Sequence, residues 1–301
     1  MPRRNPTSLI SLAVVAVLAV AFSFLPPSLI ETLPPDLQDA ARTAGELRRK
    51  VTGGFTEGSQ PRQTEPRTAG ELPTTAGSFS TAKRWLYEEV YAGQGTTFYC
   101  GCDYNSDREV DLQSCGMEQY AGNSRAERVE AEHVFPASQF GNFRKCWREP
   151  ETFDECHTSS GNVISGRSCC ERVDPVFEAA HNDLHNLFPA VGNVNGQRSN
   201  YNWGMVPRSS SERYGDCDIR IDSSIRRVQP PDGVRGDIAR TMFYMRDIYG
   251  FRLSRQDEQL YTAWNREDSP DAWEIERDRR ITKIQGISNP YVSDYERLAR
   301  R

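Results

Sequence analysis

The longest run of apolar residues lies close to the amino terminus. Residues 9–25 contain no charged side chain, and Arg3 and Arg4 precede them. A short basic segment followed by such a run is the pattern of a secretory signal, and a run of 17 residues is also close to the lower limit for a helix that spans a bilayer. We therefore expect residues 1–25 to be either a signal peptide or an uncleaved signal anchor that tethers the protein to a membrane.

Apolar residues are sparse in the next segment, which is rich in Pro, Gly, Thr and charged side chains. The hexapeptide Arg-Thr-Ala-Gly-Glu-Leu occurs in it twice, at residues 42–47 and 67–72. Two copies do not make a repeat architecture, and a segment of this composition cannot bury enough apolar surface to fold alone. We expect residues 26–78 to be a flexible linker, with the hexapeptide as duplicated linker sequence in preference to a binding motif.

From Phe79 onward apolar residues recur at helical spacing, and aromatic residues, cysteines and histidines become frequent. The pattern predicts helices at residues 81–91, at 237–249 with Gly250 ending the helix, at 254–264 with a capping box of Ser254 and Asp257, and lastly around Trp273, Ile281 and Ile284 with an end at Gly286. Short strands are expected at residues 96–100 and 128–132. Residues 79–301 are therefore expected to form one α+β domain with a helical majority and its own core.

Composition excludes some classes of protein and leaves others open. A single long apolar run excludes a polytopic membrane protein, and five Trp, 12 Tyr and 13 Phe exclude a chain that is disordered throughout. The net charge is −5, and residues 79–301 carry 29 of the 37 basic and 35 of the 42 acidic side chains, a net charge of −6. A domain with this charge binds nucleic acid only through a local cleft, and such binding is non-specific and sensitive to salt.

Candidate chemistry begins with Glu132 and His133, which are adjacent at the end of a predicted strand. A carboxylate is an oxygen ligand for Mg²⁺, and a histidine with an ordinary pKa near neutrality can act as a base. The pair alone is a weak signal, but residues 182–200 add five asparagines and Arg198. Amides at this density are unusual in a helix that only packs, whereas an amide oxygen can bind Mg²⁺ and leave the positive charge of the ion for a phosphate.

Several segments, in matching order and spacing, resemble the bacterial endonuclease I family of periplasmic or secreted non-specific nucleases, which belongs to the ββα-metal (His-Me finger) class. Matching segments include Glu132-His133-Val-Phe-Pro-Ala137, Asp183-Leu-His-Asn-Leu187, Val194-Asn195-Gly, Arg198-Ser-Asn200, Tyr214-Gly-x-Cys217 and Lys283-Ile-Gln-Gly286. The resemblance extends through the domain and implies a helix-rich, disulfide-braced α+β fold that contains a ββα-metal core.

The resemblance also implies a role for particular residues. Glu132 and Asn195 would hold one Mg²⁺, with water in its other positions, and His133 would take a proton from the attacking water. Arg167 would stabilise the phosphate or the product through a bidentate guanidinium, and the products would carry 5′-phosphate and 3′-hydroxyl ends. Arg198 is a candidate contact to DNA phosphates, and so are four residues for which a solvated helix face is the alternative: Arg235, Arg240, Arg277 and Lys283.

The cysteines are expected to form disulfides, because the chain carries an export signal. Six of the eight match positions in the family: Cys100, Cys102, Cys115, Cys146, Cys170 and Cys217. The other two, Cys156 and Cys169, lie in a stretch that the family pattern lacks, and a bond between them would close that inserted loop. The sequence does not determine how the other six cysteines pair.

The sequence thus predicts an exported, monomeric, Mg²⁺-dependent endonuclease that cuts DNA, and RNA as well, without sequence preference. It would be periplasmic or secreted, or tethered to a membrane through residues 9–25. The alternative is a catalytically inactive, tethered nucleic-acid-binding protein on a nuclease scaffold. A thiol–disulfide exchange protein fits less well, because Cys100-Gly-Cys102 has one residue between its cysteines instead of two.

Overall fold

The computed structural model describes residues 72–207 and 214–298. The expected signal or membrane tether within residues 1–25 lies outside the described residues, as does most of the expected linker of residues 26–78 with its duplicated hexapeptide. In the part of the chain that the structure describes, no helix combines the length and the apolar character needed to cross a membrane.

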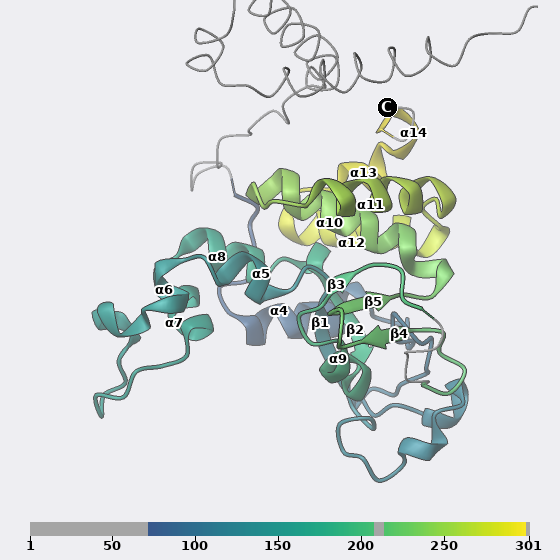
Figure 1. Ribbon diagram of the computed structural model, residues 1–301, viewed down its shortest axis with the longest axis horizontal. Coiled ribbons are helices and arrows are strands. Elements are labelled where there is room, and N and C mark those ends of the chain that lie inside the picture. Colours follow the sequence, from purple (N-terminus) through teal and green to yellow (C-terminus); the bar gives the residue numbers. More distant parts are fainter. Residues whose placement is uncertain (1–71, 208–213, 299–301) are drawn as a thin grey trace, which may run out of the picture. The chain divides into compact units, whose positions relative to one another are not determined.

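A two-stranded antiparallel ribbon followed by a helix lies at the centre of the domain (Figure 1). Strand β1 (Val129–His133) pairs with β2 (Leu187–Val191), so that the last residue of β1 lies opposite the first of β2. Helix α9 (Gly192–Arg198) follows β2 directly and packs on both strands. All five residues of β2 are buried, so this strand forms part of the core. The ββα core that the resemblance implies is therefore present.

The predicted strand at residues 96–100 is wrong. Only an isolated bridge forms there, and the Phe98 N–H donates to the carbonyl oxygen of Pro189 in β2 at 2.8 Å. Pro189 has no N–H to return, so the ladder does not extend along this edge. The chain then turns at Gly101, whose φ of 62° favours glycine, and the cysteines on either side of that turn are bonded to different parts of the chain.

A second, smaller sheet has three strands. Its order is β3 (Asn202–Trp203), β5 (Arg227–Gln229) and β4 (Arg220–Asp222), with β3 parallel to β5 and β4 antiparallel to it. Trp203 of β3 is fully buried, and its indole N–H donates to the carbonyl oxygen of Val134 at 3.0 Å. This bond connects the second sheet to the residue that follows β1.

The helices agree closely with the hydrophobic pattern. Helix α4 (Phe79–Trp85) is capped by Ser78 and continues as a π-helical turn over Leu86–Val90. The larger helices are α10 (Arg235–Tyr249), which ends at Gly250, α11 (Arg255–Glu267), which begins after Ser254, and α12 (Ala272–Gln285), which ends at Gly286. Contrary to the prediction, α12 is not the last helix, since α13 (Pro290–Ser293) and α14 (Tyr295–Leu298) follow it.

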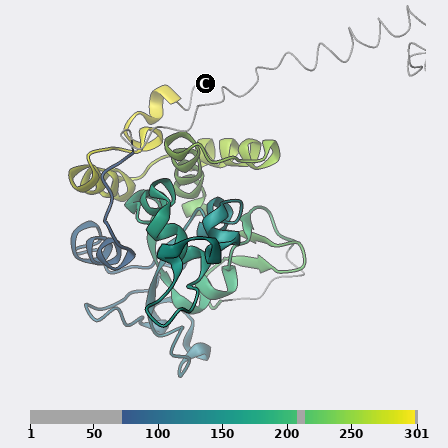
Figure 2. The same ribbon diagram turned by 90° about the vertical axis from the view of Figure 1, so that its left-hand side faces the viewer.

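Shorter elements complete the described chain. The short α-helices are α5 (Ala137–Gly141), α6 (Lys145–Arg148), α7 (Gly166–Val173) and α8 (Pro175–His181). The 3₁₀ turns are Leu112–Cys115, Glu118–Tyr120, Pro150–Thr152, Asp154–Cys156, Leu184–Asn186 and Asp232–Val234. Figures 1 and 2 show the yellow-green helices α10 to α13 on one side of the strands, with α10 packed against α11 and α13.

Four disulfides brace the domain and use all eight cysteines. The pairs are Cys100–Cys217, Cys102–Cys115, Cys146–Cys170 and Cys156–Cys169. The expected bond across the inserted loop is therefore confirmed. Two neighbouring cysteines of α7 take part in two different bonds, so this helix is held to both α6 and the inserted loop. The bonds fix α7 in position beside the cavity that contains Glu132 and His133.

Candidate active site

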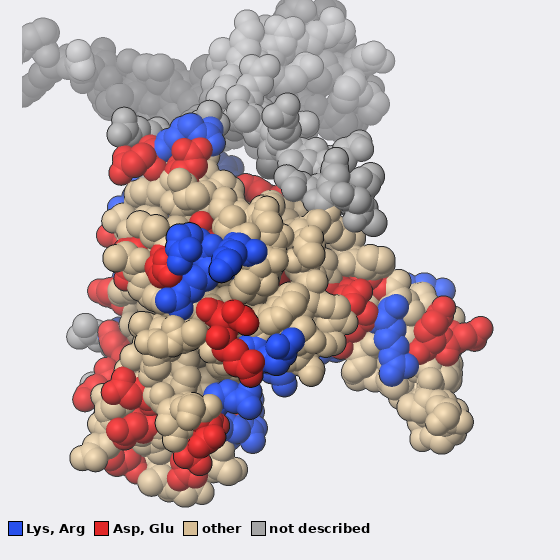
Figure 3. All heavy atoms as spheres, turned by 180° about the vertical axis from the view of Figure 1, so that it is seen from behind, with Lys and Arg blue, Asp and Glu red and all other residues tan. Residues whose placement is uncertain are grey.

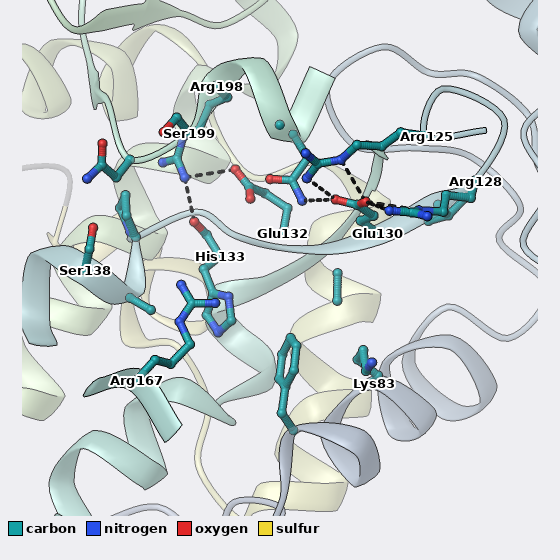
Figure 4. Close-up of a pocket in the computed structure, with 18 of the residues that line it drawn as sticks. Lys83, Arg125, Arg128, Glu130, Glu132, His133, Ser138, Arg167, Arg198 and Ser199 are labelled. Carbon is teal, nitrogen blue, oxygen red and sulfur yellow. Dashed lines mark hydrogen bonds and ion pairs between the residues drawn. The ribbon is translucent and has the colours of Figure 1, made fainter. Parts of the chain in front are cut away.

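A cavity of about 730 Å³ opens beside the ββα core and is lined by residues of β1, α9, α4, α5 and α7. It brings together all four residues to which the sequence assigned catalysis or metal binding: Glu132, His133, Arg167 and Asn195. Figure 4 shows Glu132 and His133 on β1, with the Arg167 side chain extending from α7 toward the His133 ring. Glu132 of β1 and Asn195 of α9 are 63 positions apart in the sequence (195 − 132) and meet in this one site.

The Glu132 carboxylate is buried and held by two donors. Its residue is 4% exposed, the Tyr99 hydroxyl donates to Oε1 at 2.9 Å, and the Arg198 guanidinium lies 2.9 Å from the same oxygen. Burial raises the pKa of Glu132, and the positive charge of Arg198 opposes that rise. A buried carboxylate in this position gains from a cation, because a second positive charge further favours its ionised form.

Asn195 presents its amide to the same cavity from α9. Its amide nitrogen donates to Oε2 of Glu130 at 2.9 Å, which leaves the amide oxygen as the atom that can bind a metal. No cluster of three or more His, Cys, Asp or Glu side chains suited to a metal occurs within residues 72–207 and 214–298. Two hard oxygen ligands with water in the remaining positions fit Mg²⁺, which keeps several of its waters when it binds to proteins.

His133 is the last residue of β1 and is 7% exposed. Its Nε2 lies 2.8 Å from the carbonyl oxygen of His181, and since a carbonyl only accepts, Nε2 carries the proton and Nδ1 keeps a lone pair. The ring stacks against Phe79, with 5.2 Å between centroids. Burial lowers the pKa of His133 well below its ordinary value, and the neighbouring His181 and Arg167 act in the same direction. The imidazole is therefore a neutral base in a fixed orientation.

Arg167 lies on α7 with an exposed side chain. None of the ion pairs among the described residues involves Arg167, so its guanidinium is available to an anion. Figure 4 shows it directed at the His133 ring, in the same cavity. A guanidinium presents two parallel N–H groups, which match two oxygens of a phosphate.

Two of the predicted DNA contacts are wrong, because the structure buries them. Arg198 is 1% exposed and donates to the carbonyl oxygens of His133 and Val134 at 2.9 and 2.6 Å. Arg240 is fully buried in α10 and forms a bidentate ion pair with Glu274. Arg240 lies away from the cavity, and Arg198, although it lines the cavity, is bonded to Glu132 and to these carbonyl groups, so both guanidinium groups are engaged within the protein.

The remaining predicted contacts lie away from the cavity. Arg277 is buried in α12 and donates to the carbonyl oxygens of Leu184 and Leu187 at 2.7 and 2.9 Å, so its predicted phosphate contact is wrong as well. Arg235 forms an ion pair with Asp232, and the Lys283 side chain is exposed, but neither is among the residues that line the cavity.

Sequence reasoning missed four basic residues that line the cavity beside Arg167 and Arg198: Lys83, Arg108, Arg125 and Arg128. The last two flank Glu130 and donate to its carboxylate, at 3.0 and 2.8 Å from Arg125 and at 3.1 and 2.9 Å from Arg128. Although burial alone would raise the pKa of Glu130, these bonds hold it below its ordinary value. The alternation of Glu130 and Glu132 along a strand was the one signal that could have placed Glu130 on the same face.

Comparison with known proteins agrees with this site. Residues 78–296 match the sequence pattern of the Endonuclease I family. The chain is 41% identical over 228 residues to an extracellular deoxyribonuclease of Aeromonas hydrophila, covering 73% of this chain and 91% of that relative. It is 40% identical over 224 residues to a periplasmic deoxyribonuclease of the same species, covering 72% and 86%. It is 39% identical over 219 residues to an endonuclease-1 of Buchnera aphidicola, covering 71% and 82%. The chain therefore belongs to the endonuclease I family and is a nuclease.

Proposed function

We propose that the protein is an exported, Mg²⁺-dependent endonuclease that hydrolyses phosphodiester bonds of DNA, and of RNA, without sequence preference. One observation carries the proposal: Nε2 of His133 is bonded to the carbonyl oxygen of His181, so Nδ1 is the free base in a cavity that also holds Glu132 and Asn195. The names of the relatives support DNA as the substrate, since three of them are deoxyribonucleases.

The residues of the cavity divide the chemistry among them. Glu132 and Asn195 would hold a Mg²⁺, which supplies positive charge at the scissile phosphate and at the departing 3′ oxygen. His133 would take the proton of the attacking water at Nδ1, because its neutral form is fixed by burial and by the bond at Nε2. Arg167 would bind two phosphate oxygens. Attack on the phosphorus with departure of the 3′ oxygen leaves 5′-phosphate and 3′-hydroxyl ends.

DNA binding is proposed to come from the cavity walls. Apart from the buried Arg198, the basic side chains there are Lys83, Arg108, Arg125, Arg128 and Arg167. Elsewhere the charges are mixed: on the face drawn in Figure 3, groups of Lys and Arg alternate with groups of Asp and Glu. Contacts of this kind read the phosphate backbone and not the base sequence, so binding weakens steeply as salt is raised.

Export is supported by three observations of different kinds. Residues 9–25 form an apolar run after a basic segment, four disulfides are present, and the relatives are named extracellular or periplasmic. Disulfides form and persist in oxidising compartments. A membrane tether through residues 9–25 and a monomeric state remain predictions from the sequence.

A plasmid assay tests the proposal. Purified full-length protein is incubated with supercoiled plasmid in Mg²⁺ and, in parallel, in EDTA. We expect conversion to nicked, linear and then fragmented DNA in Mg²⁺ only, with 5′-phosphate ends that a ligase can rejoin. Plasmid that stays equally intact in both would overturn the proposal, and retention of DNA at low salt without cleavage would favour the inactive binding protein instead.

A further inference from the structure

The cavity contains a second carboxylate, Glu130, that takes no part in the proposed chemistry. Glu130 lies two residues before Glu132 on β1, so the two side chains leave the strand on the same face. Its side chain is 19% exposed and accepts hydrogen bonds from Arg125, Arg128 and Asn195. Figure 4 shows Glu130 between the two arginines, on the side of the cavity away from His133.

The bond from Asn195 decides which end of its amide faces a metal. An amide has an oxygen and a nitrogen of similar size, and only the oxygen can bind Mg²⁺. Both oxygens of the Glu130 carboxylate accept hydrogen bonds from guanidinium groups, Oε1 from Arg125 and Arg128 and Oε2 from Arg125. The amide nitrogen of Asn195 must therefore point toward Glu130, at 2.9 Å, and the oxygen must point away from it.

Helix α9 is shaped to accept this arrangement. A Cβ atom on Gly196, next to Asn195, would lie 2.4 Å from a terminal guanidinium nitrogen of Arg125, and a Cβ on Gly192 would lie 2.4 Å from the backbone oxygen of Arg125 and 3.0 Å from the carboxyl group of Glu130. A side chain at position 196 would therefore have to move the Arg125 guanidinium, and one at position 192 would have to move the backbone of Arg125. Two glycines in a helix of seven residues are unfavourable for the helix itself, which indicates that the space they leave is needed.

We propose that Glu130 is a positioning residue that orients Asn195, so that the amide oxygen faces the metal site formed with Glu132. The inference rests on the proposed function, since it concerns the metal ligands named there. Arg125 and Arg128 hold the Glu130 carboxylate in place and balance its charge. When a residue that orients a metal ligand is replaced, the affinity for the metal typically falls by about 10- to 100-fold.

Binding of Mn²⁺, measured on the full chain by electron paramagnetic resonance of the free ion, tests the role without any cleavage assay. Glu130→Ala should raise the dissociation constant by about 10- to 100-fold. Glu109→Ala is the matched control. Glu109 pairs with Arg128 in an isolated β-bridge, so its replacement removes one negative charge near Arg128 and leaves the bond between Glu130 and Asn195 in place. The control should change Mn²⁺ affinity by less than about threefold, as expected for a screened surface charge. Circular dichroism and melting confirm that each variant folds.

A double substitution separates orientation from charge. In Asn195→Asp both ends of the side chain are oxygens, so its orientation no longer matters and a neighbouring carboxylate only repels it. Adding Glu130→Ala to Asn195→Asp should therefore leave Mn²⁺ affinity unchanged or improve it. An equal loss in both backgrounds would show that Glu130 acts through its charge and would overturn the positioning role. A wild-type chain whose Mn²⁺ binding is absent, or insensitive to Glu132→Ala, would overturn the proposed function as well.

Discussion

Replacing Arg198 by methionine should destabilise the fold, even though the sequence suggested a phosphate contact for this residue. Methionine keeps an apolar stem over the Trp203 ring, against which the guanidinium now packs at 4.4 Å from the centroid. It removes the ion pair with Glu132 at 2.9 Å and the donors to two backbone carbonyl groups. The change therefore leaves a buried carboxylate without its cation and removes one donor from each carbonyl group, although the Val134 oxygen keeps the Trp203 indole N–H.

The size of the effect follows from burial. The side chains of Arg198 and Glu132 are 1% and 5% exposed, so water cannot replace the lost contacts. Removing one member of a buried ion pair costs about 3–5 kcal/mol of unfolding free energy. In a domain of this size that loss lowers the melting temperature by roughly 6–20 °C. The pKa of Glu132 should rise further, because Arg198 is the main group that opposes the effect of burial.

Thermal unfolding, followed by circular dichroism, and DNA binding as a function of salt together decide the role of Arg198. Arg128→Met is the matched comparison, since Arg128 lines the same cavity with a side chain that is 57% exposed. It should cost at most about 1 kcal/mol and reduce the slope of binding against salt by about one unit. If Arg198→Met melts like the wild type and instead lowers that slope, our structural interpretation of Arg198 is refuted.

Three further predictions concern the base, the phosphate contact and the inserted loop. Because the pKa of His133 lies below its ordinary value of about 6.5, the base stays neutral under mild acid, and kcat/KM should change little between pH 7.5 and about pH 6; a tenfold fall between pH 7 and about pH 6 would contradict this. Arg167→Ala should lower kcat by about 100-fold, as for loss of one charge-stabilising donor, without changing the melting temperature, and a stability loss without a rate loss would argue for a structural role. Cys156→Ser combined with Cys169→Ser should lower the unfolding free energy by about 3 kcal/mol, whereas equal urea midpoints would show that the inserted loop is not braced by this bond.

Local signals in the sequence predicted much of the fold. Gly250 and Gly286 end α10 and α12 in left-handed conformations, and the Ser254 hydroxyl caps α11, so each boundary depends on residues within one turn of it. Strand β1 (Val129–His133) begins and ends one residue later than the strand predicted at residues 128–132. By contrast, the strand expected at residues 96–100 would have to pair with β2 at Pro189, which has no N–H to donate. The local sequence around residues 96–100 contains no information about this partner.

A site residue could be predicted where its side-chain type indicates its chemistry. It could not be predicted where its exposure or orientation depends on a residue that is distant in the sequence. Glu132 and His133 were noticed because a carboxylate beside an imidazole suits a metal and a base, whereas the assignment of Asn195 came from the resemblance to the endonuclease I family, and all three lie in the cavity. Arginines were misjudged because exposure decides their role: Arg240 is buried only because Glu274, on another helix, neutralises it. The orientation of His133 depends on a backbone carbonyl group of His181, which has no signature in the sequence.

The central claim is that His133 is the base of a phosphodiesterase site in which other residues bind the DNA. Single-turnover cleavage of a short DNA duplex by His133→Ala, at saturating Mg²⁺ and with enzyme in excess, tests it most directly. We predict DNA binding within about twofold of the wild type and a cleavage rate lower by about 10²- to 10⁴-fold, the usual contribution of a general base. Cleavage by His133→Ala at a rate within a few-fold of the wild type would contradict the account.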